Sequence, residues 1–495
     1  MAVSISIYTA VVTAVLLPIL FAIHRLYFHP LSRYNGPRLW ALTRLPYMLA
    51  FRSGQLAHKI KSFHEIYGDT VRVAPNEVSF IDPTAIKDIY NRQPNPHYKS
   101  LPKDPVRQPP PRPGQPINIL EANDTDHTRL RKAYAASFST QALTAQEPLV
   151  TTYVHKMIAQ IKARTTTTTN GAVIDLQDWI SYCTFDIMCS LSLGADFGCL
   201  DQDRYHEWVG MLVHSLKGRV QLASCRFYPW LFNYLVQRLP ETAQRMAAQH
   251  QATTKEKVQQ RLRTEVDRPD FLSHLQRSKH ELSDGEMEVN AATLIFAGSH
   301  TLQTAITGIV FHLLQHPDAL ARVTGEVRSS FATAEEIDSR KLSRLPVLEA
   351  AIKEGIRLTS PVPLGLTRLV PAGGHTICGD FFPEGTIVSY MQWAANISPR
   401  NYTHPTEFHL DRWLHPTEAP FAHDHRTATQ PFLQGPRDCI GQNLARMEIS
   451  LILGHLLYHF DLDVPRGVES LGKWDDQETY AVWLKAPLSV KVVVR

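Results

Sequence analysis

One cysteine lies in a stretch whose residue types suit chemistry at sulfur. The stretch reads Phe-x-x-Gly-x-Arg-x-Cys-x-Gly, and its fixed positions are Phe432, Gly435, Arg437, Cys439 and Gly441. Glycine permits tight backbone turns, and a cysteine thiolate is both a nucleophile and a metal ligand. Backbone N–H groups and the N-terminus of a helix starting after Gly441 would stabilise negative charge on the sulfur. The alternative is a buried structural cysteine in a loop before a helix.

This stretch resembles the haem-binding loop of the cytochrome P450 family. The resemblance implies a mainly α-helical fold with small β-sheets, and haem b (iron protoporphyrin IX) as the cofactor. It makes Cys439 the axial ligand of the iron, where a thiolate pushes electron density onto the metal and favours O–O cleavage. Arg437 would pair with a haem propionate, and Phe432, Gly435 and Gly441 would shape the loop around the macrocycle.

Further candidates for propionate binding come from the same resemblance. Arg368 follows Pro361 and Pro363, where family members place a propionate-binding arginine. His127 and Arg131 resemble the family's Trp-x-x-x-Arg, with histidine in place of tryptophan. At i and i+4 on a helix, both side chains face the same way. The alternative for this pair is an ordinary basic helix face.

A second family signature is structural. Glu354 and Arg357 match Glu-x-x-Arg, and Arg412 lies between that pair and the cysteine loop. The resemblance implies that these three residues form a buried charged triad behind the haem. Removal of one partner would leave buried charge uncompensated. The chain departs from the family at Leu410, where proline is frequent.

The oxygen-activating signature of the family is also present, with one departure. Residues 297–301 read Ala-Gly-Ser-His-Thr, against Ala/Gly-Gly-x-Asp/Glu-Thr in the family. The resemblance implies that Gly298 leaves room for dioxygen. It also implies that Thr301 hydrogen-bonds the bound oxygen and helps to pass protons. His300 stands where the family has a carboxylic acid.

His300 therefore has several interpretations. An imidazole titrates close to neutral pH and can relay protons as the acid does. It can also slow proton delivery or divert the enzyme from standard hydroxylation. In a third interpretation, His300 pairs with solvent or a neighbouring carboxylate, while Thr301 and water suffice.

The element that must position this segment is a long helix. Ser283 is a suitable N-cap, acidic residues fill the first turns, and Pro317 lies beyond the end near Gln315. Such a helix is about 50 Å long. Its centre, residues 292–298, is apolar nearly all round, which predicts a helix that crosses the core.

Smaller elements frame this helix. Residues 71–81 predict strands with a Pro-Asn turn, and residues 385–390 and 488–494 are strand-like. Residues 101–116 contain seven prolines and cannot form a helix. This segment is either a substrate-access loop or a solvated surface loop. Thr165–Thr169 predicts a loop between helices.

The N-terminus predicts a membrane anchor. Residues 3–23 contain no charged residue and would span about 31 Å as a helix, against a bilayer core of about 30 Å. Arginines follow this run and none precedes it, which places the remainder in the cytosol. We expect an anchor over 1–24, a Pro/Gly hinge over 25–45 and a haem-thiolate catalytic domain over 46–495. A cleaved signal peptide is the alternative.

Composition limits the functional classes. Among 495 residues, 44% are hydrophobic and 20% charged, which is typical of a globular chain. A net charge of +4 gives no nucleic-acid footprint. Six scattered cysteines predict free thiols and no disulfide scaffold. His423 and His425 lack further ligands at useful spacing, which favours a surface loop over a metal site.

The resemblance extends to partners and reaction. The chain is most similar to fungal members of secondary metabolism, which implies a polyketide, terpenoid or alkaloid substrate. It implies NADPH-cytochrome P450 reductase as electron donor, cytochrome b5 as a second candidate donor, and the endoplasmic reticulum membrane as location. The alternatives are desaturation, coupling or rearrangement on the same fold, prompted by His300, and a non-catalytic haem-binding protein.

Family members place substrate contacts in four segments, and the apolar residues there favour a hydrophobic substrate. The corresponding residues are 97–125, Thr293–Leu302, Val362–Thr367 and Tyr480–Trp483.

Overall fold

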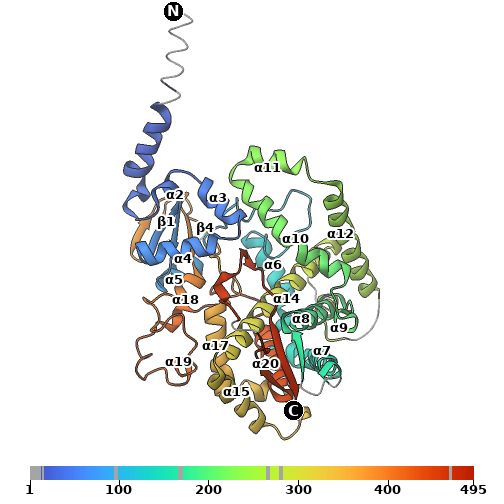
Figure 1. Ribbon diagram of the computed structural model, residues 1–495. Helices are drawn as coiled ribbons and strands as arrows, with labels where there is room; N and C mark the ends of the chain where they lie inside the picture. The colour runs from blue at the N-terminus through green and yellow to red at the C-terminus, as the bar shows by residue number, and fades with distance from the viewer. Residues whose placement is uncertain are drawn as a thin grey trace, which may run out of the picture.

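One long helix, α14 (Asp284–Gln315), crosses the middle of the molecule and is surrounded by other helices (Figure 1). The computed structural model describes residues 13, 16–93, 98–165, 171–263, 268–277, 282–467 and 471–495. Over these residues the chain is mainly helical, with four small β-sheets. The expected fold class is therefore confirmed.

The other α-helices lie on both sides of α14 in the sequence. Those before it are α2 (Arg38–Leu42), α3 (Leu45–Arg52), α4 (Leu56–Tyr67), α5 (Thr84–Tyr90), α6 (Asp124–Ala135), α7 (Thr140–Thr165), α8 (Leu176–Leu193), α9 (Cys199–Gln202), α10 (Glu207–Ser224), α11 (Pro229–Val236), α12 (Glu241–Leu262) and α13 (Phe271–Arg277). Those after it are α15 (Pro317–Ser330), α16 (Ser339–Leu342), α17 (Pro346–Thr359), α18 (Gln392–Asn396), α19 (Asp411–Leu414) and α20 (Gln442–His459).

The largest sheet has the strand order β1-β2-β7-β4 and joins distant parts of the chain. Its strands are β1 (Thr70–Ala74), β2 (Glu77–Phe80), β7 (Ile387–Tyr390) and β4 (Arg368–Leu369). β2 and β7 run parallel, and the other pairs are antiparallel. The second sheet has the order β3 (Ala172–Asp175), β11 (Ser489–Val494), β8 (Phe460–Asp463). Two hairpins complete the set, β5 (His375–Ile377) with β6 (Asp380–Phe382), and β9 (Thr479–Tyr480) with β10 (Val482–Trp483).

Most of the predicted smaller elements are confirmed. Residues 71–81 form the β1–β2 hairpin, and the two later strand-like segments lie in β7 and β11. Residues 101–116 contain no helix. Of the polar tract Thr165–Thr169, only Thr165 lies within the described residues, and it ends α7. All six cysteines are free.

The predicted long helix is confirmed to within one residue. Ser283 caps α14 with a full capping box, since its side chain accepts from the Glu286 N–H and the Glu286 carboxylate accepts from the Ser283 N–H. The helix packs closely on α17 at two glycines. A Cβ on Gly308 would lie 2.1 Å from Thr359 Cγ2, and one on Gly355 would lie 2.4 Å from Ile309 Cγ1. The two helix backbones can approach because neither glycine carries a side chain.

The expected triad is present and fully buried. Arg357 donates to both oxygens of Glu354 at 2.8 Å, and Arg412 Nε donates to Glu354 Oε1 at 3.1 Å. All three side chains have an exposed fraction of 0%. Burial alone would raise the pKa of Glu354, but the charges and hydrogen bonds of the two arginines lower it to about 2. Glu354 is therefore a carboxylate.

The triad also holds the irregular segment that leads to the cysteine loop. Arg357 donates to the carbonyls of Asn396 and Glu407 at 2.7 and 3.0 Å. Arg412 donates to the carbonyl of Thr403 at 2.8 Å and pairs with Asp424. The arginine donors replace the backbone partners that a regular element would supply.

The N-terminal part contains an exposed apolar helix. Residues 1–12 and 14–15 lie outside the described residues, and the helix seen there runs over Leu16–Phe28. Its apolar side chains are exposed, as with Leu17 at 59% and Phe28 at 73%. Within the described residues only α14 has the length and hydropathy of a membrane span, and α14 is a buried core helix. Of the predicted anchor over 1–24, the structure therefore describes only residue 13 and residues 16–24.

Candidate functional site

The cysteine loop precedes α20 and is closed by its own backbone. The Cys439 N–H donates to the Phe432 carbonyl at 2.9 Å. Gly435 has a φ of +84°, and a Cβ there would lie 2.2 Å from the Tyr90 carbonyl oxygen, so only glycine fits. Gly441 differs from the expectation. Its φ is −89°, and a Cβ there would make an ordinary contact, so the turn itself does not require glycine.

Cys439 is the one cysteine that is exposed as a residue; four of the others are buried and Cys378 is half-buried. Burial of the sulfur by the surrounding loop raises the thiol pKa, and Asp438 adds to this. The Gly441 N–H and the charge of Arg131 act in the opposite direction. The expected backbone stabilisation is present but does not outweigh burial. A bound metal cation would remove the thiol proton outright.

A group of cations lies beside the loop. Arg368 is 3% exposed and lies over the Tyr90 ring at 5.2 Å, and its Nε has no hydrogen-bond partner. Lys103 forms an isolated backbone bridge with Arg368, which fixes the two residues side by side. Arg437 donates to Asp124 Oδ1 at 2.7 Å. Lys103 and Arg368 thus lie close to the Arg437–Asp124 pair, and Glu121 is a second carboxylate that acts on Lys103.

The pKa values in this group reflect crowding of like charge. Burial, Arg437 and Arg368 lower the pKa of Lys103 to about 7. His127 lies in the same place, and burial with Arg437 and Lys103 lowers its pKa to about 4. His127 is therefore neutral near pH 7. The region as a whole favours binding of an anion.

Arg131 and His127 lie on the same helix, α6, as expected, but their side chains contact different residues. Arg131 donates to the Asp438 carbonyl at 2.6 Å and pairs with the Asp438 carboxylate at 2.6 Å. Arg131 therefore links α6 to the cysteine loop, while His127 lies among the cations described above.

On α14 the threonine of the signature is half-buried. Thr301 Oγ1 donates to the Ala297 carbonyl at 2.6 Å. The space beside Gly298 is filled by Met188 of α8, since a Cβ on Gly298 would lie 2.6 Å from Met188 Cε. The described contacts thus explain Gly298 by helix packing, whereas the sequence suggested space for dioxygen.

His300 is 4% exposed, and its Nδ1 lies 3.0 Å from Lys485 Nζ. Burial, followed by the Lys485 charge, lowers the His300 pKa well below its usual value. The expectation of an imidazole that titrates near neutral pH is therefore wrong. The partner of His300 is a lysine, where the third interpretation expected solvent or a carboxylate.

One predicted substrate segment, Tyr480–Trp483, forms the β9–β10 hairpin. Tyr480 and Trp483 are buried at 1% and 0%, and Trp483 Nε1 donates to the carbonyls of Thr359 and Ser360. Trp483 thereby attaches the hairpin to the end of α17. Ala481, between them, is exposed.

Sequence reasoning missed several charged residues of the site and its support. Lys103 lies in a proline-rich stretch with no pattern of its own. Asp124 opens α6 directly after its N-cap Asn123, which is a signal for a helix start alone. Asp424 lies between His423 and His425, which are exposed as expected, and no pattern pairs it with Arg412. Lys485 follows a hairpin that is distant from α14 in sequence.

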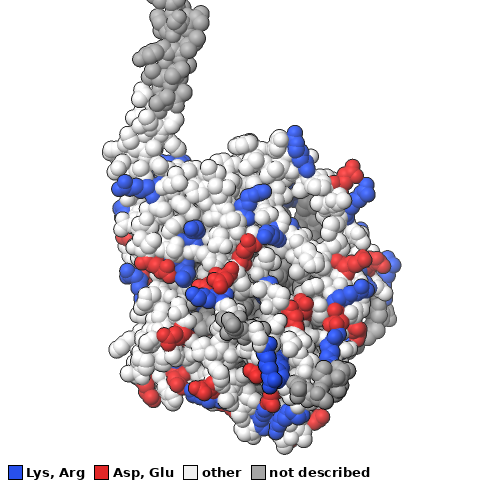
Figure 2. Space-filling model, viewed as in Figure 1, with Lys and Arg blue, Asp and Glu red and all other residues white. Residues whose placement is uncertain are grey.

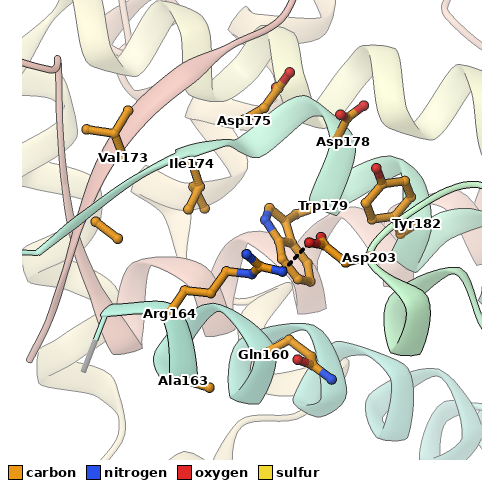
Figure 3. Close-up of a pocket in the computed structure, with 11 residues that line it drawn as sticks. Gln160, Ala163, Arg164, Val173, Ile174, Asp175, Asp178, Trp179, Tyr182 and Asp203 are labelled. Carbon is orange, nitrogen blue, oxygen red and sulfur yellow. Dashed lines mark hydrogen bonds and ion pairs between the residues drawn. The ribbon is translucent and has the colours of Figure 1, made fainter. Parts of the chain in front are cut away.

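A surface pocket lies elsewhere, between α7, α8 and β3 (Figure 3). Its walls include Trp179 and Tyr182, and Arg164 forms an ion pair there with Asp203. None of the residues of the cysteine loop or of the cationic group lines it. This pocket is separate from the candidate site.

Comparisons with known proteins agree with the geometry. The cytochrome P450 family model matches residues 35–492. Averantin hydroxylase of Dothistroma septosporum is 36% identical over 478 residues, which cover 95% of this chain and 88% of that protein. Cytochrome P450 monooxygenase astA of Talaromyces wortmannii is 36% identical over 485 residues, with 97% and 96% covered. Cytochrome P450 monooxygenase efuB of Hormonema carpetanum is 36% identical over 489 residues, with 98% and 95% covered. The chain therefore belongs to the cytochrome P450 family, whose members are haem b monooxygenases.

Proposed function

We propose that this monooxygenase inserts one oxygen atom from O2 into a hydrophobic intermediate of fungal secondary metabolism, a polyketide, terpenoid or alkaloid. The observation that carries the proposal is the Cys439 loop next to a group of cations in which Arg368 is buried and its Nε lacks a hydrogen-bond partner. The similarity to an averantin hydroxylase supports a hydroxylation. The proposed electron donor is NADPH-cytochrome P450 reductase, with cytochrome b5 as a second donor.

The residues present fit haem b. Lys103, Arg368 and Arg437 against Asp124 and Glu121 leave an excess of positive charge when all are ionised, and propionates would neutralise it. A propionate would also supply the acceptor that Arg368 Nε lacks. We propose Cys439 as the iron ligand and these cations, with His127, as the propionate site. Arg131, Phe432, Gly435 and Gly441 hold the loop.

The bound haem thiolate supplies the redox chemistry that cleaves the O–O bond. The chain's own contribution on α14 is control of protons. The Thr301 hydroxyl donates a hydrogen bond to the Ala297 carbonyl at 2.6 Å, and its oxygen still has lone pairs that can accept one. We propose that Thr301 Oγ1 accepts a proton from water while it releases its own toward the reaction centre.

A second candidate reaction rests on His300. Because a buried neutral imidazole replaces an acid, proton delivery differs from that of the family signature. Slower delivery would favour desaturation, coupling or rearrangement over insertion of oxygen. The hydrophobic substrate is common to both candidates.

The proposed location is the endoplasmic reticulum membrane, with an anchor over 1–24, a hinge over 25–45 and the catalytic domain over 46–495 facing the cytosol. The exposed apolar helix Leu16–Phe28 supports it. Helix α11 lies at the same end of the molecule and exposes Trp230 at 71% and Tyr234 at 50% (Figure 1). Lys and Arg side chains lie on the surface at the base of the N-terminal helix (Figure 2).

Oxygen incorporation tests the reaction. Microsomes with the protein and a reductase are given NADPH, 18O2 and a panel of polyketides, averantin among them, terpenoids and alkaloids. We expect one product that carries a single 18O atom. A product that has lost two hydrogens and carries no 18O would favour the second candidate. NADPH consumption that stays flat across the panel would contradict the proposal.

Haem retention tests the propionate site. Arg368→Gln removes a buried charge-assisted partner that contributes about 1.5–3 kcal/mol, so we expect haem transfer to apomyoglobin to be about tenfold faster or more. Arg344→Gln, on an exposed turn, is the matched control. Equal transfer rates for wild type and Arg368→Gln, with unchanged far-ultraviolet circular dichroism, would argue against a propionate at Arg368.

Membrane insertion is tested on the full chain in microsomes. We expect the protein to stay in the pellet after alkaline carbonate extraction, because an apolar span of this length is stable in a bilayer. Protease added outside the vesicles should digest the catalytic domain. Release by carbonate, or protection of the catalytic domain, would overturn the proposed anchor or its orientation.

A further inference from the structure

A lysine from the end of the chain reaches the oxygen-activating helix. Lys485 Nζ lies 3.0 Å from His300 Nδ1 and 3.0 Å from Thr304 Oγ1. His300 and Thr304 are one turn apart on α14, so the amino group bridges two side chains on one helix face. The bridge lies at the position where the family signature has a carboxylic acid.

The hydrogen bonds around Lys485 limit the direction of each donor. The Thr304 hydroxyl donates its only proton to the His300 carbonyl at 2.9 Å. Its oxygen must therefore accept from Lys485. If Lys485 is protonated, it has three donors and no acceptor, so His300 Nδ1 also accepts and the imidazole proton lies on Nε2. If Lys485 is a neutral amine, its lone pair can instead accept from an Nδ1–H.

The backbone on both sides of Lys485 is held in place. Trp483 Nε1 donates to the Thr359 carbonyl at 2.7 Å and the Ser360 carbonyl at 3.0 Å. The Leu484 N–H donates to the Glu478 carbonyl at 2.9 Å, and the Ala486 N–H donates to Gln477 Oε1 at 2.7 Å. The position of the amino group is thus set by the hairpin and its attachment to α17.

The surroundings contain little to compete with this bridge. Among the described residues, Lys485 forms no ion pair with a carboxylate, whereas Lys217 near the same hairpin pairs with Glu478. Burial alone lowers the pKa of Lys485. Burial and Lys485 lower that of His300, and the backbone carbonyl of His300 acts weakly against them. Phe296 is the aromatic neighbour, with ring centroids 5.5 Å apart.

We infer that Lys485 is a positioning residue for His300 and the donor of the contact between them: with Nζ donating to Nδ1, the imidazole is neutral and carries its proton on Nε2. The acid position of the signature then presents an N–H donor, where aspartate or glutamate presents only acceptors. A water molecule hydrogen-bonded to this imidazole must turn a lone pair toward Nε2. The role in proton delivery rests on the proposed function, while the tautomer does not.

The tautomer is measured directly. The holoprotein is labelled with 15N-histidine and studied in its diamagnetic reduced carbon monoxide form, by two-bond 15N–1H correlation between pH 6 and 8. His300→Gln identifies the His300 signals by difference. We expect a neutral ring with the proton on Nε2 throughout this range. An imidazolium, or a proton on Nδ1, in the wild type would overturn the inference without any further variant.

Variants of the lysine then assign the cause. In Lys485→Met the ring proton of His300 should no longer be confined to Nε2, so that signals of an Nδ1-protonated or charged ring appear. Lys485→Arg should keep the proton on Nε2. Lys491→Met, the same change on strand β11, is the matched control. Unchanged His300 signals in a folded, haem-loaded Lys485→Met protein would contradict the assignment.

Coupling gives the functional readout. With reductase and NADPH, Lys485→Met should release several-fold more peroxide per NADPH than wild type, and Lys485→Arg should lie near wild type. An unchanged ratio in Lys485→Met would remove Lys485 from proton delivery. If no variant and no wild-type protein consumes NADPH, the proposed function fails, while the tautomer measurement still decides the positioning role.

Discussion

The buried carboxylate of Glu354 supports the irregular segment that leads to the cysteine loop. Two arginines that have no access to solvent share this carboxylate, and their remaining donors bind carbonyls between Asn396 and Glu407. That segment has little regular structure, so its backbone would otherwise lack partners. Loss of one charge would leave others buried and unpaired, which typically costs about 3–5 kcal/mol. The hydrogen-bond network around Glu354 therefore positions the segment that leads to the cysteine loop.

The loop depends in turn on close backbone contact. Gly435 lies against the Tyr90 carbonyl, and Tyr90 also supports Arg368 through its ring. The cysteine and the cationic group are thus held by the same tyrosine. An anionic cofactor that places its metal at the sulfur and its carboxylates at the arginine would satisfy both. The Cys439 sulfur and the unpartnered Nε of Arg368 would be the two ends of one binding site for such a cofactor.

Local patterns account for what could be predicted from the sequence. The capping box at Ser283, the hairpin over 71–81 and the Glu354–Arg357 spacing each depend on residues a few positions apart. Residues that act across long separations gave no such signal. Lys485 reaches His300 over 185 positions, and Arg437 reaches Asp124 over 313.

Tertiary packing decided two features that local patterns could not predict. Within the segment Tyr480–Trp483, which was expected to contact substrate, the Trp483 indole nitrogen binds the carbonyls that end α17. The expectation of a near-neutral pKa for His300 fails because its burial and its lysine partner are not visible in the sequence. In both cases the surroundings come from segments that are distant in the sequence.

The proposed role of Cys439 is to bind haem iron as a thiolate. The direct test is the carbon monoxide difference spectrum of the dithionite-reduced protein in membranes, for wild type and Cys439→His. We predict the red-shifted Soret band of thiolate-ligated haem in the wild type and its loss in the variant. A wild-type protein that is folded but shows no such band, or a variant that retains it, would contradict the account.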